Sequence, residues 1–474
     1  MSLYFDYNST TPLEPEVTQA IQTAAQNHWE NPSSQYGECA RKQIDWSRSM
    51  LGRMIQANPD GTESSSLNKY FSDLIFTSGG TEANHSVFHT FVNLKLNAIP
   101  HIITTNTEHP SVLIPLKQLH ADGHIELTVV PVSHKTGIVH FEDIVAVLRP
   151  NQTVLVSVML ANNETGAISP IEEIAQGIRK WERDLPSNSL PLGRIFIHSD
   201  MAQVVGKLPI NVRSLGVDYA TIVGHKFYGP RIGCLFVRGL HTYGPGQWEQ
   251  SMRQSIKANG DSHNHNELSD VNDQLDGVGA APFVPLFRGG GQERGFRAGT
   301  ENTPMIAGLG KAAELVVRNL DQYMEHFLVM RTLLERSLHQ AFPRDGPIRV
   351  CIFGVDRCSN ISICSGDSGL VNRFPHFSGR LPNTVNVTFI GPSWLNSGAI
   401  LARCPQLEAS RGAACHSSES NVQGSSVLRA CGYSSQEARG AIRLSLGRQT
   451  TCEQIALAVT NLKRAISELL QENS

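Results

Sequence analysis

The sequence predicts an α/β fold with a mainly parallel sheet, followed by a smaller α/β domain. Short apolar runs of strand length alternate with helical segments between residues 74 and 237. The run at 153–159 is apolar almost throughout, which is typical of a strand covered on both faces. Alternating strands and helices favour parallel pairing, because a crossover helix returns the chain to the same edge of the sheet.

The elements are expected in the following order along the chain. Two helices come first, at residues 13–30 and 38–57, separated by the turn sequence Asn31-Pro32-Ser33-Ser34. The polar, Ser-rich stretch 58–68 predicts a surface loop. The strands predicted after it are 74–77, 101–104, 126–130, 153–159, 194–198, 219–223 and 233–237.

The stretch 241–281 interrupts this pattern, because it is rich in Gly, Asn, Asp, Ser and Gln. It predicts a flexible insertion in a loop, and its pair His263 and His265 is expected to be solvated rather than to bind metal. After residue 320 we expect a long helix, strands at 349–353 and 384–389, and a closing helix at 452–470. The predicted organisation is a large domain at 15–320 and a small domain made of 1–14 and 321–474.

Composition excludes several classes of protein. The 474 residues are 40% hydrophobic and 18% charged, and the net charge is −3, so neither nucleic acid nor an anionic membrane is indicated as a partner. No apolar run reaches the ~18–20 residues that span a bilayer. The first seven residues have no basic or apolar targeting character, so the cytosol is expected. Nine scattered cysteines without a CxxC pair predict reduced thiols rather than disulfides.

Three signals, each weak alone, follow one another at strand ends. The turn Ser78-Gly79-Gly80-Thr81 precedes a helix and suits a phosphate. Asp200 follows a strand and suits a pyridine nitrogen. Lys226 follows another strand and can form a Schiff base with a carbonyl cofactor. Ligands bind at the carboxyl ends of strands in open α/β sheets, so the three together predict a pyridoxal-phosphate site. No metal is predicted.

Ten motifs in one order carry a resemblance to a known family. They are Asp6-Tyr7-Asn8-Ser9-Thr10-Thr11-Pro12, Asn31-Pro32-Ser33-Ser34, Phe76-Thr77-Ser78-Gly79-Gly80-Thr81-Glu82-Ala83-Asn84, Glu108-His109, Asn162-Asn163-Glu164-Thr165-Gly166, His225-Lys226, Gly290-Gly291-Gln292-Glu293, Arg297-Ala298-Gly299-Thr300, Gly412-Ala413-Ala414-Cys415 and Ile442-Arg443-Leu444-Ser445. The chain resembles the class V aminotransferases, in the branch of cysteine desulfurases and selenocysteine lyases. The resemblance covers nearly the whole chain except 58–70 and 241–281. It implies fold type I of the pyridoxal-phosphate-dependent transferases.

The resemblance also implies a role for each matching residue. It assigns to the cofactor Lys226, which holds it covalently, His109 on the ring face, Asp200 at the ring nitrogen, Gln203 and Asn163 near the 3′-oxygen, and Gly80, Thr81 and His225 at the phosphate. Thr300 is expected to reach the phosphate of a neighbouring subunit, which implies a homodimer. Arg443 is expected to bind the substrate carboxylate, since a planar fork suits a carboxylate, and Asn163 is expected to lie near the substrate. Cys415 is expected to accept the chalcogen atom.

The expected reaction releases selenium from L-selenocysteine and leaves L-alanine, with cysteine desulfuration as the alternative. The surroundings of Cys415 and Lys226 resemble the selenocysteine lyases. Two departures remain: Pro110 follows His109 where an acidic or basic residue is expected, and Val223 replaces a serine that would bind phosphate. A plain aminotransferase, with no role for Cys415, and a non-catalytic binding protein are the other candidates. The intact Lys226 and its partner residues argue against the last.

Overall fold

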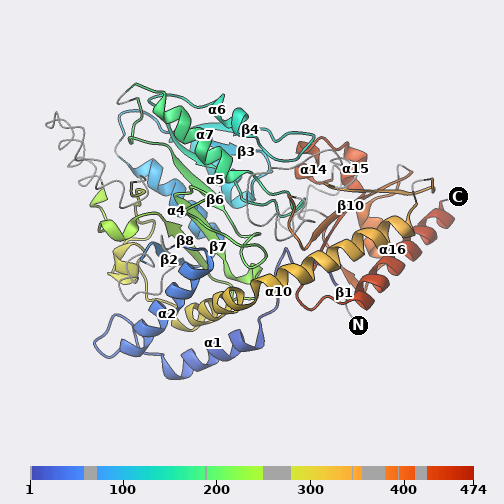
Figure 1. Cartoon of the computed structure of the whole chain (residues 1–474), viewed down its shortest axis with the longest axis horizontal. Helices are drawn as coiled ribbons and strands as arrows, with labels where there is room; N and C mark the ends of the chain where they lie inside the picture. The colour runs from blue at the N-terminus through green and yellow to red at the C-terminus, as the bar shows by residue number, and fades with distance from the viewer. Residues whose placement is uncertain are drawn as a thin grey trace.

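A seven-stranded sheet forms the centre of the fold in the computed structural model, which describes residues 3–57, 72–94, 96–186, 189–248, 279–343, 345–354, 379–392, 394–411 and 424–473 (Figure 1). Its order is β2-β8-β7-β6-β5-β3-β4. The strands are β2 (Leu74–Thr77), β3 (His101–Thr105), β4 (Glu126–Val130), β5 (Thr153–Ser157), β6 (Phe196–Asp200), β7 (Tyr219–Val223) and β8 (Gly233–Val237).

Pairing in this sheet is mainly parallel, as predicted. Strands β4, β3, β5, β6 and β7 pair in parallel, whereas β8 is antiparallel to both β7 and β2. The antiparallel strand was not predicted. Only the short helix η2 (Gly224–Lys226) and a turn separate β7 from β8, and a connection without a crossover helix returns the chain in the opposite direction.

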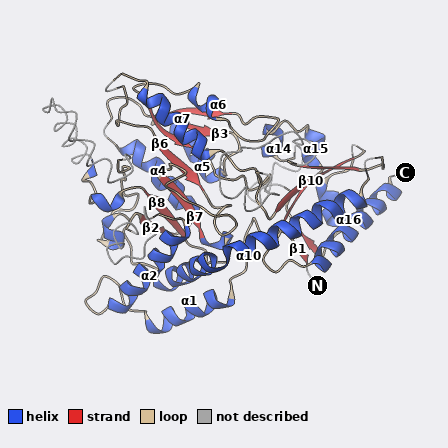
Figure 2. Ribbon diagram, in the orientation of Figure 1, coloured by secondary structure: helices blue, strands red, loops and turns tan. Residues whose placement is uncertain are grey.

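Helices cover both faces of the sheet, which explains the apolar strands. Neighbouring residues on one strand enter different cores: Ile102 packs with α4 (Gly80–Asn93) and α5 (Pro110–Ala121), whereas Ile103 packs with α7 (Ile171–Arg183) and α2 (Glu38–Met54). This alternation follows the two-residue period of a strand. The short α6 (Phe141–Val145) lies beside α7, as Figure 2 shows.

A second, three-stranded antiparallel sheet has its own core. Its order is β12-β10-β9, from β9 (Arg349–Ile352), β10 (Thr384–Ile390) and β12 (Ala441–Ser445). Helix α16 (Cys452–Glu472) packs on it. Nearby, β1 (Leu3–Tyr4) pairs in parallel with β11 (Leu407–Glu408). The remaining short elements are η3 (Leu240–Thr242), η4 (Gln292–Gly295), α12 (Ser397–Ala402), α14 (Ser426–Ala430) and α15 (Ser435–Arg439).

One long helix joins the two parts. Helix α10 (Thr303–Ala341) contacts α1 (Pro15–Asn27) and α2 at one end and α16, β9 and β10 at the other (Figure 1). The prediction that it begins after residue 320 was wrong. Asn302 caps it by accepting a hydrogen bond from the Met305 N–H, with a proline in the first turn. The proposed division between residues 320 and 321 therefore falls inside one helix, and the two-domain assignment stays a prediction.

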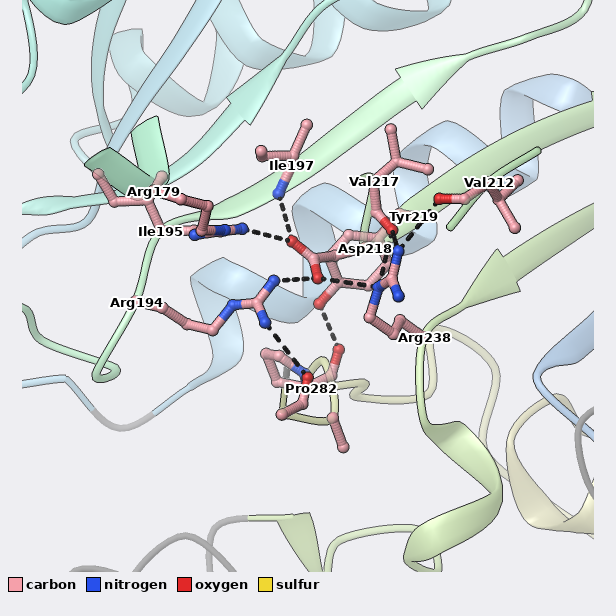
Figure 3. Close-up of polar contacts among 12 residues, drawn as sticks. Arg179, Arg194, Ile195, Ile197, Val212, Val217, Asp218, Tyr219, Arg238 and Pro282 are labelled. Atoms are coloured by element: carbon pink, nitrogen blue, oxygen red, sulfur yellow. Dashed lines mark hydrogen bonds and ion pairs between the residues drawn. The ribbon is translucent and has the colours of Figure 1, made fainter. Parts of the chain in front are cut away.

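A buried carboxylate fixes the starts of β6 and β7. Asp218 accepts from the Ile197 N–H at 2.9 Å and lies within ion-pair distance of Arg179, Arg194 and Arg238 (Figure 3). The strand begins at Phe196 rather than at 194, and Arg194 lies just before it with its side chain on Asp218. This cluster anchors the two strands whose far ends carry Asp200 and Lys226.

Other boundaries shift by a few residues. The strand expected at 153–159 ends at Ser157, and the two first helices end at Asn27 and Met54. The loop predicted at 58–68 and the insertion, apart from its ends at 241–248 and 279–281, lie outside the described residues. In the parts of the chain that the structure describes, no helix is long and apolar enough to cross a bilayer.

Candidate active site

A pocket of about 300 Å³ opens where β6 and β7 end. It is lined by Asn8, Ser9, Gly80, Thr81, His109, Ser111, Met159, Ala161, Asn163, Asp200, Ala202, Gln203, Val223, His225, Lys226 and Arg443. The structure thus brings together nine of the eleven residues that the sequence singles out. The other two are Thr300 and Cys415.

Lys226 ends the turn η2 that follows β7. The turn needs Gly224, because a Cβ there would lie 2.4 Å from the Pro230 carbonyl oxygen. The Lys226 amine donates to the carbonyl oxygens of Asn8 and Ser9, both at 2.7 Å. The N-terminal segment therefore holds the amine at the pocket.

Asp200 is the last residue of β6 and is 8% exposed. Its two oxygens accept from the Ala202 N–H at 3.0 Å and from the Asn84 side-chain amide at 3.0 Å. Two donors therefore hold both oxygens of the carboxylate in place. A fixed anion at a pocket wall is the group that a protonated pyridine nitrogen requires.

Gln203 lies one turn beyond Asp200. Its amide donates to the Asn8 carbonyl at 3.0 Å and accepts from the Lys207 amine at 2.9 Å. Burial lowers the pKa of Lys207 well below its usual value, and the cations Lys226 and Arg443 lower it further. Sequence reasoning missed Lys207, although its spacing of four from Gln203 is compatible with contact.

The residues predicted to bind the phosphate also meet here. Among the described residues no side chain caps the N-terminus of α4, so its first N–H groups remain available to an anion. A Cβ at Gly80 would lie 2.5 Å from the Val223 side chain, so Val223 packs against the glycine turn instead of adding a hydroxyl. Burial, then Lys226 and Arg231, lower the pKa of His225 to about 4, so His225 contributes a neutral ring at pH 7.

Arg443, in the middle of β12, is the substrate-binding candidate and is 2% exposed. Its guanidinium donates to the Asn163 carbonyl at 2.9 Å, to the Ser9 hydroxyl at 2.8 Å and to the Asp6 carboxylate. Its Nε has no hydrogen-bond partner among the described residues. A buried donor of this kind calls for an acceptor, and a ligand carboxylate would supply one.

Asn8 is the main site residue that sequence reasoning missed. Its side chain bonds the Lys207 amine, Asn383, Thr384 and the Asn163 carbonyl, while its backbone bonds Lys226, Gln203 and Ser445. Asn8 belongs to the motif at residues 6–12, but nothing in that motif indicates which residues it contacts. Through these bonds Asn8 fixes the Lys226 amine, the Gln203 amide and the Asn163 carbonyl relative to one another.

The remaining two candidates are Thr300, which lines another cavity, and Cys415, which the structure does not describe. Thr300 is exposed and lines a separate cavity of about 250 Å³ with Ser78 and Arg297. Cys415 lies outside the described residues, but Ser410 pairs with Arg443 through backbone hydrogen bonds of 3.2 and 2.8 Å. Ser410, five residues before Cys415 in the sequence, therefore lies beside a strand whose Arg443 lines the pocket. Within the described ranges, no cluster of three or more His, Cys, Asp or Glu side chains suits a metal.

Glu108, next to His109, is buried with one oxygen unpartnered among the described residues. Burial raises its pKa from 4.5 to about 8, against hydrogen bonds from the Met159 N–H and Thr105 that lower it. The folded state then holds a proton that the unfolded chain releases above pH 4.5. Stability from this group is therefore full below pH 4.5 and lost as the pH rises through 8.

We expect Glu108→Gln to remove this pH dependence. As the pH rises from 5 to 8, the free energy of unfolding of the wild type should fall relative to that of the variant, by at most about 1.4 kcal/mol per pH unit. The thermal midpoint of the wild type should fall with it. Thermal unfolding across this range measures it, with Glu142→Gln, an exposed glutamate, as the control. Parallel curves for wild type and Glu108→Gln would contradict the assignment.

Comparisons with known proteins agree with this geometry. The family model "Aminotransferase class-V" matches residues 3–267. A "Selenocysteine lyase" from Bos taurus is 41% identical, covering 98% of this chain and 94% of that protein. A "Cysteine desulfurase IscS" from Dictyoglomus turgidum is 31% identical over 98% of this chain and 95% of its own.

Solved structures point the same way. A structure described as "NIFS-LIKE PROTEIN" superposes with a TM-score of 0.72 and 25% identity, covering 98% of this chain and 100% of the other. The family model spans more than half of the chain, and the curated relatives align over nearly all of it. The chain therefore belongs to the class V aminotransferase family.

Proposed function

We propose that this protein is a pyridoxal-phosphate-dependent selenocysteine lyase, which converts L-selenocysteine to L-alanine and passes selenium to an acceptor. The observation that carries the proposal is one pocket that combines the Lys226 amine, the Asp200 carboxylate and the Arg443 guanidinium. The relatives named selenocysteine lyase, at 40–41% identity, are more similar than the desulfurases at 30–31%. That difference favours selenocysteine over cysteine.

Pyridoxal phosphate is the cofactor of this family, and the side chains present fit it. Lys226 would hold its carbonyl carbon, Asp200 its ring nitrogen, and Gln203 with Asn163 its 3′-oxygen. The α4 N-terminus, Thr81 and His225 would hold the phosphate. Bound there, the cofactor supplies a carbonyl that joins amines and a ring that accepts electrons from the substrate Cα.

The chain's own groups would perform the remaining steps. Arg443 would bind and orient the substrate carboxylate, and Lys226 would take the proton from Cα. Asp200 would keep a proton on the ring nitrogen. Cys415 would accept selenium: the carbon–selenium bond breaks, the thiol hydrogen ends on Cβ as L-alanine forms, and an S–Se bond forms on Cys415. His109 is placed to move a proton.

We further propose a homodimer in which Thr300 serves the neighbouring subunit's phosphate. The support is that Thr300 is exposed and lines a cavity separate from its own chain's pocket. The molecular mass in solution tests this, and a monomer would overturn it.

The cytosol is the proposed location, where the free thiols of the described cysteines stay reduced. Recovery of the protein in an organelle fraction would refute this location.

Release of L-alanine from L-selenocysteine and from L-cysteine, measured side by side, tests the substrate. A large excess for selenocysteine supports the lyase and makes Pro110 an allowed variant. Equal rates, or a preference for cysteine, would assign the protein to the cysteine desulfurases. Turnover that needs a keto acid would indicate an aminotransferase.

Cys415→Ala is expected to lower cysteine turnover at least about a hundredfold, because the acceptor thiol is lost. The same alanine assay measures the effect. Cys452→Ala is the matched control, because Cys452 is an exposed thiol at the start of α16. Unchanged cysteine turnover in Cys415→Ala would refute the acceptor role.

A further inference from the structure

Asn84, in α4, is fully buried and uses every hydrogen-bonding group of its side chain. Its nitrogen donates to Asp200 Oδ2 at 3.0 Å and to the Ser111 hydroxyl at 2.9 Å. Its oxygen accepts from the Thr221 hydroxyl at 2.7 Å. One amide therefore links the residue proposed for the ring nitrogen to the start of α5.

The chemistry of the partners fixes which way the amide points. An ionised carboxylate only accepts hydrogen bonds, so the Asn84 atom that faces Asp200 is the nitrogen. The atom that faces Thr221 is then the oxygen, and the Thr221 hydroxyl donates. Thr221 in turn lies 3.1 Å from Nε2 of the buried His198, whose Nδ1 lies 2.8 Å from the Ser157 hydroxyl. Every member thus has a partner, which makes the network rigid.

The same reasoning fixes the tautomer of His109. The Ser111 backbone N–H donates to His109 Nδ1 at 3.1 Å, and a backbone N–H cannot accept. His109 Nδ1 therefore carries a lone pair and no hydrogen. The Ser111 hydroxyl, 2.7 Å from the same nitrogen, must donate to it as well. The neutral imidazole then has its hydrogen on Nε2.

We propose that Asn84 is a positioning residue that sets two groups of the site through one amide. It holds the Asp200 carboxylate directly, and through Ser111 it holds His109 as the tautomer with hydrogen on Nε2. His109 then presents a hydrogen-bond donor at Nε2 rather than a base. The structural part stands on its own contacts, while its consequence for turnover rests on the proposed function.

The first test reads the tautomer directly. The protein with its cofactor bound is labelled with ¹⁵N-histidine, and the His109 signals are identified by their loss in His109→Gln. We expect Nδ1 to give the signal of an unprotonated ring nitrogen and Nε2 that of a protonated one. The reverse assignment would overturn the proposal. This readout does not depend on the substrate, so it separates failure of the proposal from failure of the proposed function.

The second test uses variants. Asn84→Ala should lower kcat about ten- to a hundredfold with KM within about twofold, because the lost hydrogen bonds act on groups that serve the reaction. Ser111→Ala should also lower kcat, but by less, and it should not impair folding because Ser111 is only half-buried. Ser111→Thr, which keeps a hydroxyl, should restore the kcat that Ser111→Ala loses. The pH dependence of the bound cofactor's visible absorbance should also change in Asn84→Ala and in Ser111→Ala.

Ser86→Ala is the matched control for these variants. Ser86 is buried on the same helix, and its hydroxyl donates to the Glu82 carbonyl at 2.8 Å, away from the network. It should leave kcat and the absorbance unchanged. If Ser111→Ala behaves like Ser86→Ala in both measurements, Ser111 does not transmit the effect and the proposal fails.

Discussion

Lys226→Ala should lower turnover by about 10³–10⁴-fold, the largest effect expected of any single substitution, because the residue is proposed both to hold the cofactor and to move the Cα proton. Folding should be nearly unaffected. The two carbonyls that accept from the amine lie at the pocket rather than in the core, and the loss of the Lys226 cation removes one of the charges that lower the pKa of Lys207. Alanine formation and the thermal midpoint measure the two effects.

The covalent role of Lys226 has its own readout. After borohydride reduction, mass spectrometry should find the cofactor on the peptide that contains Lys226 in the wild type and on no peptide in Lys226→Ala. Lys207→Met is the matched control, since Lys207 also bonds Asn8 but does not line the pocket. A label on Lys207, or turnover that survives in Lys226→Ala, would refute the assignment.

Arg443→Lys should reduce kcat/KM by about 30- to 1,000-fold, mainly through KM. Lysine keeps the charge but loses the planar fork that binds a carboxylate at two points, a loss of about 2–4 kcal/mol. It also removes the Nε donor, which has no partner in the described part of the chain, and loosens the contacts with Ser9 and Asp6. Retention of the cofactor should not change.

Initial rates over a range of substrate concentration measure this effect. Arg331→Lys is the control, because Arg331 is equally buried, at 3% exposed, but donates to backbone carbonyls near residue 381, outside the pocket. It should cost stability without changing KM. If KM stays unchanged in Arg443→Lys, the substrate carboxylate binds elsewhere.

Local signals explain what the sequence could predict. A few consecutive residues are enough to recognise each of three signals: a strand followed by Lys226, a strand followed by Asp200, and a glycine turn before a helix. Because parallel strands end at the same edge, their meeting at one pocket followed from the fold class. The order and type of most elements were predictable for the same reason.

The rest depends on contacts between distant residues. Asn8 reaches Ser445 across 437 positions, and Asn84 reaches Asp200 across 116, so no window of sequence reveals either pair. The antiparallel direction of β8 was missed because a buried strand has the same apolar pattern whether it pairs in parallel or antiparallel. The start of α10 was missed although Asn302 and the following proline gave a usable capping signal.

The N-terminal segment has a consequence for how the protein is made. Residues 6–9 are synthesised long before their partners Arg443 and Ser445, which lie 434 to 437 positions further along the chain. Contacts of such long sequence separation form late, after the local helices and strands. The pocket is therefore completed only after β12 has been synthesised, and a nascent chain truncated before β12 would present Lys226 in an open, unfinished site. Capture of the cofactor thus reports that these two distant segments of the chain have found each other.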